Sequence, residues 1–541
     1  MANYLRSLFA LLVYKPFHLY KKMALRRKVR PEDEGLPLFE EVRDDDLKDG
    51  EVSCKERSLT GDRANVALLF FLYTLQGIPL GLASAMPMLL QNRKGVLYKD
   101  QALFSLVAWP FSIKLLWAPI VDSVFSERFG RRKTWLVSSQ YMIGIFMILL
   151  SYRVDLWVSD PKGPHTILLT CLFFALNFLA ATQDIAVDGW ALTMLKRENV
   201  GLASTCNSVG QTAGYFLGYV VFIALESADF CNTYLRTEHQ PEGVVTLPNF
   251  LYYMGGIFLL STTLVALFKR EAPDEDNGEQ DKDIKGTYQQ LLRIVRLPAV
   301  RTLALILLTC KVSFCACDAI AGLKLVEAGV PREQFAMVAL FLIPLQVSLP
   351  LLLTRYLVSD APMDVYTKAI PYRLAFNLLA AAFVWLTPHL ITKDHIPFHY
   401  YVLLILLYGL HQITLYSMFV SQLSFFFARI SDPNMGGTYM TLLNTLANLG
   451  TSWPNSLILL FVDGFSSSYC SNDPDNNCSC ASLIEQCTTG AGECVKWLDG
   501  FYVLIVLCTL YGVVWMRWGR HTVHELQRRG DHHWKLSLHK R

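Results

Sequence analysis

The sequence predicts an all-α membrane protein with twelve transmembrane helices arranged in two six-helix halves. Hydrophobic residues make up 52% of the 541 positions and charged residues only 18%, below the roughly 25% of soluble domains. From Ala64 onward, apolar runs of about 18 or more residues recur, and this length crosses a bilayer as a helix. The net charge of +3 is too small to indicate a nucleic-acid-binding protein. Because of the apolar runs, the expected partner is the lipid bilayer.

The predicted spans alternate with polar loops, and a charged linker divides them six and six. They are expected near 64–90, 101–121, 134–152, 166–194, 201–225, 250–268, 299–323, 335–354, 372–387, 399–428, 436–462 and 499–518. The chain then consists of an N-terminal segment (1–63), a first bundle (64–268), a linker (269–298), a second bundle (299–518) with a Cys-rich loop (463–498), and a tail (519–541). Such symmetry is common among secondary transporters, whose cargo binds between the halves.

Basic residues predict how the chain is oriented. The N-terminal segment, the GRRK motif at 130–133, the pair Lys196 and Arg197, and the C-terminal tail fall on one side if twelve spans are present. Because cytosolic loops carry an excess of Lys and Arg, both termini are expected in the cytosol. The first apolar run, residues 8–14, is too short to span the bilayer and favours an interfacial helix.

Cysteines are concentrated on the opposite side. Five of the thirteen lie in the loop between the last two spans, and a sixth follows span five; the set is Cys231, Cys470, Cys478, Cys480, Cys487 and Cys494. Their even number predicts up to three disulfides in an oxidising compartment. A zinc site is the alternative, but the paired CxxC spacing is missing. The sequon that begins at Asn477 makes this residue a predicted glycosylation site.

Two aspartates, Asp184 and Asp188, lie in the apolar span four within the string TQDIAVDGWAL. A carboxylate at this depth costs about 2.5–3.5 kcal/mol, so it usually faces the protein interior and has a function. The four-residue spacing places both on one helical face. Asp184 is expected to carry a proton or to hold a polar group of the cargo. Alternatively, both aspartates pair with basic side chains and fix the packing of the helices.

Basic residues inside the spans are candidates for binding an anionic cargo, since Lys and Arg form charge-assisted hydrogen bonds with phosphates. Lys311 is the best candidate, near the middle of span seven, and Lys114 in span two is the second. The alternative for Lys311 is a structural pair with Asp318 or Asp184. Arg373 opens span nine and is interpreted as a snorkelling or latch residue.

Polar and aromatic side chains complete the predicted cargo site. They are Gln183, Asn207, Gln211, Tyr408, His411 and Gln412, with Gln76 on a further interior face. An aromatic ring and an amide four residues apart in span ten could stack on a nucleobase and bond to it. His411 is equally compatible with a structural role in the bundle core. Span five also carries Gly210, Gly214 and Gly218 on one stripe, which predicts close contact with another helix.

The loop between spans two and three has the pattern APIVDSVFSERFGRRK. It resembles the signature of the major facilitator superfamily, in which an acid and arginines latch the two halves on the cytosolic side. The resemblance assigns this role to Asp122, Arg131 and Arg132, and Asp188 is expected to pair with one of the two arginines. The alternative is a cluster that only sets the topology.

Several strings resemble the acetyl-coenzyme A transporter family, solute carrier family 33. They include TQDIAVDGWAL, LYTLQGIPLGLASAMPMLLQ and GGTYMTLLNTLANLG, and the likeness covers residues 64–520. The family implies import of acetyl-CoA from the cytosol into the endoplasmic reticulum lumen by alternating access, where it supplies acetylation, without a cofactor. Bacterial muropeptide permeases share the shorter string QDIAVD.

Two alternatives remain at the level of sequence. A carrier of another large anion, muropeptide-like or glutathione-disulfide-like, would use the same polar residues. An integral acyltransferase would use His411 as a base, but the six-plus-six organisation argues against an enzyme. The chain contains no GxxxxGK[ST] loop, so no ATP-driven motor is predicted.

Overall fold

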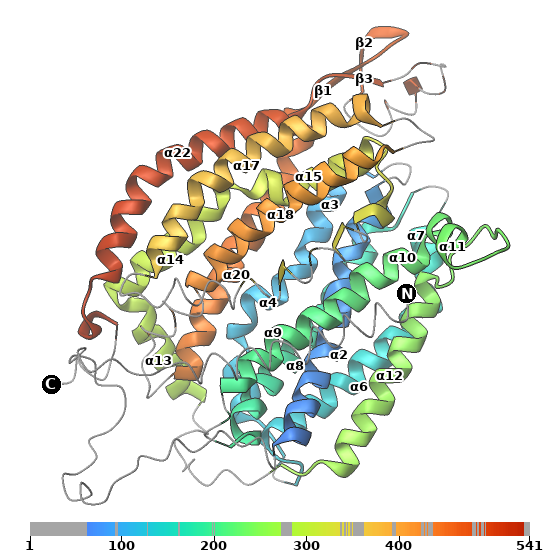
Figure 1. Ribbon diagram of the computed structural model, residues 1–541. Helices are drawn as coiled ribbons and strands as arrows, with labels where there is room; N and C mark the ends of the chain where they lie inside the picture. Colours follow the sequence, from blue (N-terminus) through green and yellow to red (C-terminus); the bar gives the residue numbers. More distant parts are fainter. Residues whose placement is uncertain are drawn as a thin grey trace, which may run out of the picture.

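The computed structural model describes residues 62–91, 96–126, 128–160, 163–196, 201–271, 284–335, 362–391, 396–422, 436–478 and 494–534, with isolated positions in the gaps. Figure 1 shows long helices in two bundles that lie side by side, with a small sheet at one end. The predicted helical membrane architecture is confirmed for the two bundles, whereas the small sheet was not predicted. The N-terminal segment with its predicted interfacial helix lies outside them.

The first bundle contains the helices encoded before the linker. They are α2 (Arg63–Gln91), α3 (Tyr98–Ser105), α4 (Trp109–Ile113), α5 (Ala118–Ser123), α6 (Arg131–Ser151), α7 (Val154–Val158), α8 (Thr166–Met194), α9 (Gly201–Phe216), α10 (Phe222–Glu226), α11 (Ala228–Tyr234) and α12 (Leu247–Phe268). A π-helical turn, Leu217–Val221, joins α9 to α10 and completes the predicted span five.

The second bundle follows an amphipathic linker helix, α13 (Ile284–Arg296). Its elements are α14 (Pro298–Cys310), α15 (Cys315–Glu327), α17 (Met363–Leu390), α18 (Phe398–Val420), α20 (Gly436–Val462), β1 (Ser467–Cys470), β2 (Asp473–Asn477), β3 (Cys494–Leu498) and α22 (Gly500–Gln527). The three strands form an antiparallel sheet in the order β2-β1-β3.

Among the described residues, nine helical segments are long and apolar enough to cross a membrane. Three predicted spans are not among the nine. Span two is broken into short helices, and span eight lies largely outside the described residues. Span eleven corresponds to α20, which has 27 residues but carries many polar ones in its first half. The number twelve therefore stays a prediction.

Both intramembrane lysines lie where a helix is interrupted. Lys114 opens the 3-10 turn Lys114–Leu116 between α4 and α5, which each carry a proline in their first turn. Lys311 likewise opens the 3-10 turn Lys311–Ser313 between α14 and α15. At Lys114 the two prolines account for the interruption, because proline cannot donate a backbone hydrogen bond. Short 3-10 stretches within a helix often mark a functional hinge.

The apolar side chains divide between the interior of each bundle and its outer surface. Phe173, Phe222 and Phe258 are fully buried in the first bundle, and Phe314 and Tyr366 are buried in the second. Large apolar side chains also cover the outer faces, as expected where the surrounding solvent is lipid rather than water. Each half has buried clusters of its own, and a third cluster joins Tyr98 and Ala102 of the first half to the second half.

The glycine stripe of span five packs α9 directly against α2. A methyl group at Gly214 would overlap the carbonyl oxygen of Thr74 and lie 2.8 Å from the Cα atom of Gly77. A methyl group at Gly218 would overlap the carbonyl oxygen of Ile78 in the same way. The predicted close helix contact is therefore confirmed, and only glycine allows the two backbones to approach this far.

Replacing Gly214 with alanine is expected to destabilise the protein by about 1–3 kcal/mol, because backbone atoms of α2 must move to admit the methyl group. Gly256→Ala is the matched control, since nothing lies within 4 Å of a methyl group there. Thermal unfolding of the two variants in detergent compares them. An equal effect of the two substitutions would contradict the packing argument.

The sheet marks one side of the molecule. Figure 1 places β1, β2 and β3 at the end opposite to the first turn of α2 and the last turn of α22. We call these ends the Cys-loop side and the termini side. Both described ends of the chain thus lie on one side, opposite to the Cys-rich loop. Asn477 ends β2 on the Cys-loop side, and its glycosylation stays a prediction.

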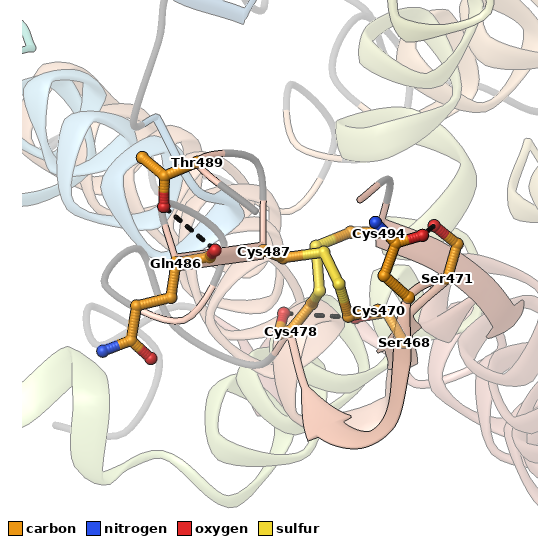
Figure 2. Close-up of a disulfide and its surroundings, with 9 residues drawn as sticks. Ser468, Cys470, Ser471, Cys478, Gln486, Cys487, Thr489 and Cys494 are labelled. Carbon is orange, nitrogen blue, oxygen red and sulfur yellow. Dashed lines mark hydrogen bonds between the residues drawn. A yellow bond between two sulfur atoms is a disulfide. The ribbon is translucent and has the colours of Figure 1, made fainter. Parts of the chain in front are cut away.

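Four of the six predicted cysteines form disulfides, as Figure 2 shows. The pairs are Cys470–Cys487 and Cys478–Cys494. The disulfide predicted for Cys231 is wrong. Cys231 is a free, buried thiol that donates to the carbonyl oxygen of Leu225 at 3.3 Å. It lies in α11 and bonds back to the end of α10, so it does not pair with the loop. Cys480 lies outside the described residues.

Candidate functional site

Asp184 is buried in the first bundle between three elements. Its carboxylate forms an ion pair with the ammonium group of Lys114 and accepts a hydrogen bond from the amide of Gln76 on α2. Both charged side chains are almost fully buried, with 11% of Lys114 and 6% of Asp184 exposed. The break in span two places Lys114 where it reaches α8.

Asp188 lies one turn further along α8 and belongs to the same network. It accepts hydrogen bonds from the hydroxyl of Tyr73 at 2.8 Å and from the amide of Asn207 at 3.0 Å. The ammonium group of Lys114 is 3.9 Å away. We call these residues, with Asp184 and Gln76, the first-half cluster. One lysine against two carboxylates leaves it with a formal charge of −1.

The first-half cluster joins α2, the break in span two, α8 and α9. Lys114 is bound by carboxylates, which does not favour its predicted contact with an anionic cargo. The interpretation that the two aspartates fix helix packing gains support, because four elements meet on them. Tyr73 was not predicted as part of this site, since a tyrosine in an apolar helix has no distinctive sequence signal.

The predicted latch residues lie together at the termini side of the first bundle. Arg132 forms an ion pair with Asp122, and the Nε of Arg131 donates to the backbone carbonyl of Asp122 at 2.7 Å. Asp188 belongs to the first-half cluster rather than to this pair, which corrects its predicted latch role. The reason is that its carboxylate faces α2 and α9, while Asp122 already holds Arg132.

Gly189, directly after Asp188, allows Arg132 to lie against α8. A methyl group at Gly189 would be 2.5 Å from the Nε of Arg132. The start of α6 is capped by Glu271, which accepts from the backbone N–H groups of Arg132 at 3.0 Å and Lys133 at 2.9 Å. The ammonium group of Lys133 donates to two carbonyls at the end of α12, both at 2.7 Å. This corner therefore fastens four elements of one half.

The second bundle contains a different arrangement of charges. Arg373 on α17 donates to both carboxylate oxygens of Asp318 on α15, at 2.6 and 2.7 Å. The Nε2 of His411 on α18 is 3.1 Å from the same carboxylate. The guanidinium of Arg373 also lies 4.6 Å from the centre of the Phe314 ring. Because Arg373 is only 5% exposed, it does not snorkel to the membrane surface, which corrects that interpretation.

Lys311 is close to this group but does not pair with Asp318, which corrects the alternative expected from their spacing. Its ammonium group donates to the carbonyl oxygen of Ala447 at 3.1 Å and to the hydroxyl of Thr451 at 2.6 Å, both on α20. Among the residues that the structure describes, no carboxylate lies within 4.0 Å of it. We call Lys311, Asp318, Arg373 and His411 the second-half cluster.

The two clusters differ in charge. In the second-half cluster, two cations against one carboxylate leave a formal charge of +1, and protonation of His411 would add another. The first-half cluster has a formal charge of −1. Since charges act more strongly in a medium of low dielectric constant than in water, an anion at mid-membrane depth is attracted to the second half and repelled by the first.

The remaining predicted residues are distributed over both halves. Gln183 is fully buried with its amide 3.5 Å from the carbonyl oxygen of Leu72, so it packs α8 against α2. Gln211 lies on α9, and Tyr408 and Gln412 lie on α18, all partly buried. A methyl group at Gly322 would be 3.7 Å from the hydroxyl of Tyr408, so this ring packs against α15.

Hydrogen bonds between the two halves extend from the Cys-loop side to about mid-depth. Glu226 at the end of α10 pairs with Arg332 at 2.6 Å, and the hydroxyl of Tyr98 donates to Glu327 at 2.8 Å. Deeper in the molecule, Ser112 bonds to Ser452 at 2.7 Å. On the termini side, among the described residues, Tyr288 of the linker helix α13 donates a hydrogen bond to the backbone carbonyl of Leu116 in the first half.

Two helical bundles with charged side chains between their helices, joined by hydrogen bonds on the Cys-loop side, have the architecture of the major facilitator fold. The same fold occurs in a bacterial homologue of the human lysosomal transporter Spinster, at 14% identity over 86% of this chain and 98% of that chain, with a TM-score of 0.55. A nucleoside transporter is similar at 10% identity over 84% and 98%, with a TM-score of 0.51.

The chain belongs to the acetyl-coenzyme A transporter 1 family, whose model matches residues 65–279, 272–392 and 370–536. An uncharacterized protein of Schizosaccharomyces pombe is 34% identical over 82% of this chain and 83% of its own length. An uncharacterized membrane protein of Saccharomyces cerevisiae is 29% identical over 82% and 92%. The anhydromuropeptide permease of Escherichia coli K12 is 27% identical over 27% and 29%. The predicted resemblance is thus confirmed, and the chain is a transporter rather than an acyltransferase.

Proposed function

We propose that the protein carries acetyl-CoA from the cytosol into the endoplasmic reticulum lumen by alternating access, and so supplies acetyl groups for acetylation there. In this proposal the termini side faces the cytosol and the Cys-loop side faces the lumen. Membership of a family named for acetyl-CoA transport supports the cargo. The disulfides on one side of the molecule support an oxidising compartment there.

The observation that carries the proposal within the molecule is the positive second-half cluster. Acetyl-CoA is a polyanion because of its phosphate groups, and binding it in the membrane requires cations that are not already neutralised. Lys311 is such a cation among the described residues: its partners are a hydroxyl and a carbonyl. Phosphates bound to Lys and Arg form the strong class of charge-assisted hydrogen bonds.

Uptake of radiolabelled acetyl-CoA into proteoliposomes tests the proposal. We expect saturable uptake of intact acetyl-CoA, and competition by unlabelled acetyl-CoA stronger than by glutathione disulfide or by an anhydromuropeptide. The similarity to the anhydromuropeptide permease makes a muropeptide-like anion the second candidate. Transport of either competitor without transport of acetyl-CoA would replace the proposed cargo with that alternative.

Asp122→Asn is expected to slow transport while leaving the equilibrium affinity for acetyl-CoA nearly unchanged. The substitution releases Arg132 at the edge of the membrane, so it affects the switch between access states rather than contact with cargo. Initial uptake rates and equilibrium binding separate the two effects. Glu525→Gln is the control, since it removes an exposed pair with Arg529 at 3.2 Å. A loss of affinity at a normal rate would contradict the latch role.

A further inference from the structure

The Cys-rich insert between α20 and α22 lies, at both of its ends, beside the contacts that join the two halves on the Cys-loop side. Asp463, which opens the 3-10 turn after α20, accepts a hydrogen bond from the backbone N–H of Lys99 at 3.0 Å. Lys99 lies in the first turn of α3 in the other half, so this contact joins the two halves. The first residue of the insert is therefore part of the inter-half contact.

Asp499, the last residue of the insert, is connected to the other half through Lys324. Asp499 pairs with Lys324 on α15, a side chain that is only 5% exposed. Lys324 also lies 3.1 Å from Glu327 and 5.0 Å from the centre of the Tyr98 ring. Tyr98 belongs to the first half and donates its hydroxyl to Glu327. Asp499 thus holds Lys324 beside Glu327 and Tyr98, the two residues that bond across the halves.

The two ends of the insert are tied to each other and to the disulfides. The backbone N–H of Gly500 donates to the hydroxyl of Ser466 at 2.9 Å, which closes the root of the insert. Strand β1 then runs antiparallel to β3, with Cys470 opposite Cys494. Because Asp499 directly follows β3 and β1 begins shortly after Asp463, the sheet connects the disulfides to both contact residues.

The two disulfides are also close enough to exchange with each other. The sulfur atoms of Cys478, Cys487 and Cys494 all lie within 4.8 Å of one another, and Figure 2 shows the two bonds side by side. Cys470, Cys478 and Cys487 are buried, whereas Cys494 is partly exposed. Attack from solvent is therefore expected first at Cys494, and the thiolate released at Cys478 would face Cys487.

We propose that the described parts of the insert, residues 463–478 and 494–499, form the outer part of the gate that closes the carrier on the Cys-loop side, and that reducing the two disulfides weakens this gate. The thiol–disulfide balance of the compartment on that side then sets how often the carrier opens to it. The inference rests on alternating access from the proposed function, but not on the identity of the cargo.

The chemistry is ordinary thiol–disulfide exchange with a dithiol reductant. One thiolate of the reductant attacks a sulfur of the protein disulfide and forms a mixed disulfide, releasing a cysteine thiolate that takes up a proton. The second thiol of the reductant then displaces the second cysteine. Each protein disulfide gains two electrons and two protons and becomes two thiols, while the reductant becomes a cyclic disulfide.

The test measures the width of the Cys-loop side in the full-length protein, reconstituted in lipid nanodiscs. Ketone-bearing residues replace Tyr234 and Phe398, which are exposed on this side in opposite halves, at 61% and 81%. They accept spin labels without thiol chemistry, so electron–electron distances can be recorded. One sample is reduced with dithiothreitol and alkylated before labelling; the other is alkylated only. Mass spectrometry counts the alkylated cysteines.

We expect the longer-distance population to increase about tenfold on reduction, which corresponds to the loss of one charge-assisted hydrogen bond across the gate. Asp463→Asn, with its disulfides intact, is expected to raise the same population. Asp155→Asn is the control, because this exposed aspartate on the same side is bonded by Ser159 of its own turn at 3.4 Å.

Two outcomes would overturn the proposal. If Asp463→Asn widens the opening but reduction does not, the disulfides do not control the gate. If neither change affects the distances, the insert is not part of the gate. Failure of acetyl-CoA uptake with a normal response to reduction would instead count against the proposed cargo alone, so the two failures can be told apart.

Discussion

Replacing Lys311 with alanine is expected to weaken the binding of acetyl-CoA about tenfold to a hundredfold. A hydrogen bond to a charged group contributes roughly 1.5–3 kcal/mol, and each 1.4 kcal/mol is about a factor of ten in affinity. Without Lys311, the second-half cluster keeps one arginine against one carboxylate and loses its net positive charge. Equilibrium binding of labelled acetyl-CoA to the purified protein measures the change.

Two variants make this result specific. Thr451→Val removes the hydroxyl that Lys311 contacts at 2.6 Å but keeps the charge, so a smaller loss of affinity is expected. Lys285→Ala removes a lysine that is exposed on α13, so it should leave affinity unchanged. If Lys311→Ala bound acetyl-CoA normally, the charge argument would be lost and the cargo would be supported by family membership alone.

Replacing Lys114 with methionine is expected to destabilise the protein by about 3–5 kcal/mol. Removing one partner of a buried ion pair leaves the other charge uncompensated in a medium of low dielectric constant. Here the substitution leaves two carboxylates, Asp184 and Asp188, close together without a cation. Thermal unfolding in detergent and the yield of monodisperse protein measure the loss.

A second substitution distinguishes this cause from simple loss of packing. Adding Asp184→Asn to Lys114→Met removes the uncompensated charge that faces the lysine position, so most of the lost stability should return. A double-mutant cycle gives the coupling between the two residues. If the double variant were no more stable than Lys114→Met, the ion pair would not be what holds these helices together.

Much of the fold could be predicted because the signals are local. The length and apolarity of a segment decide whether it spans a bilayer, and most expected spans agree with observed helices to within a few residues, as in α8 (Thr166–Met194). The glycine stripe of span five likewise predicted a close contact, since four-residue spacing fixes which side chains share a helical face. The partner of each buried charge could not be predicted in this way.

In each half, the predicted partner of one charged side chain inside a span was wrong. Asp188 was expected to meet the arginines of the loop, and a pair with Asp318 or Asp184 was the alternative expectation for Lys311. Instead, Asp188 bonds to Tyr73 and Asn207, and Lys311 bonds to α20. The interruption at Lys311 shifts the helical phase, so counting residues along one unbroken helix does not predict which side chains face this lysine. The direction of Asp188 depends instead on how α8 is rotated against α2 and α9.

By itself, the sequence determined the class of protein, the family and the loop in which the disulfides form. These depend on hydrophobicity, motif identity and the order of the spans, which are properties of the chain rather than of its contacts. The tertiary structure alone decided that the first-half cluster is negative and the second positive, and that Cys231 remains free. It also decided that Asp463 meets the opposite half and that Asp499 holds Lys324 beside it, because such contacts depend on how deep each helix sits and how far it is rotated about its axis.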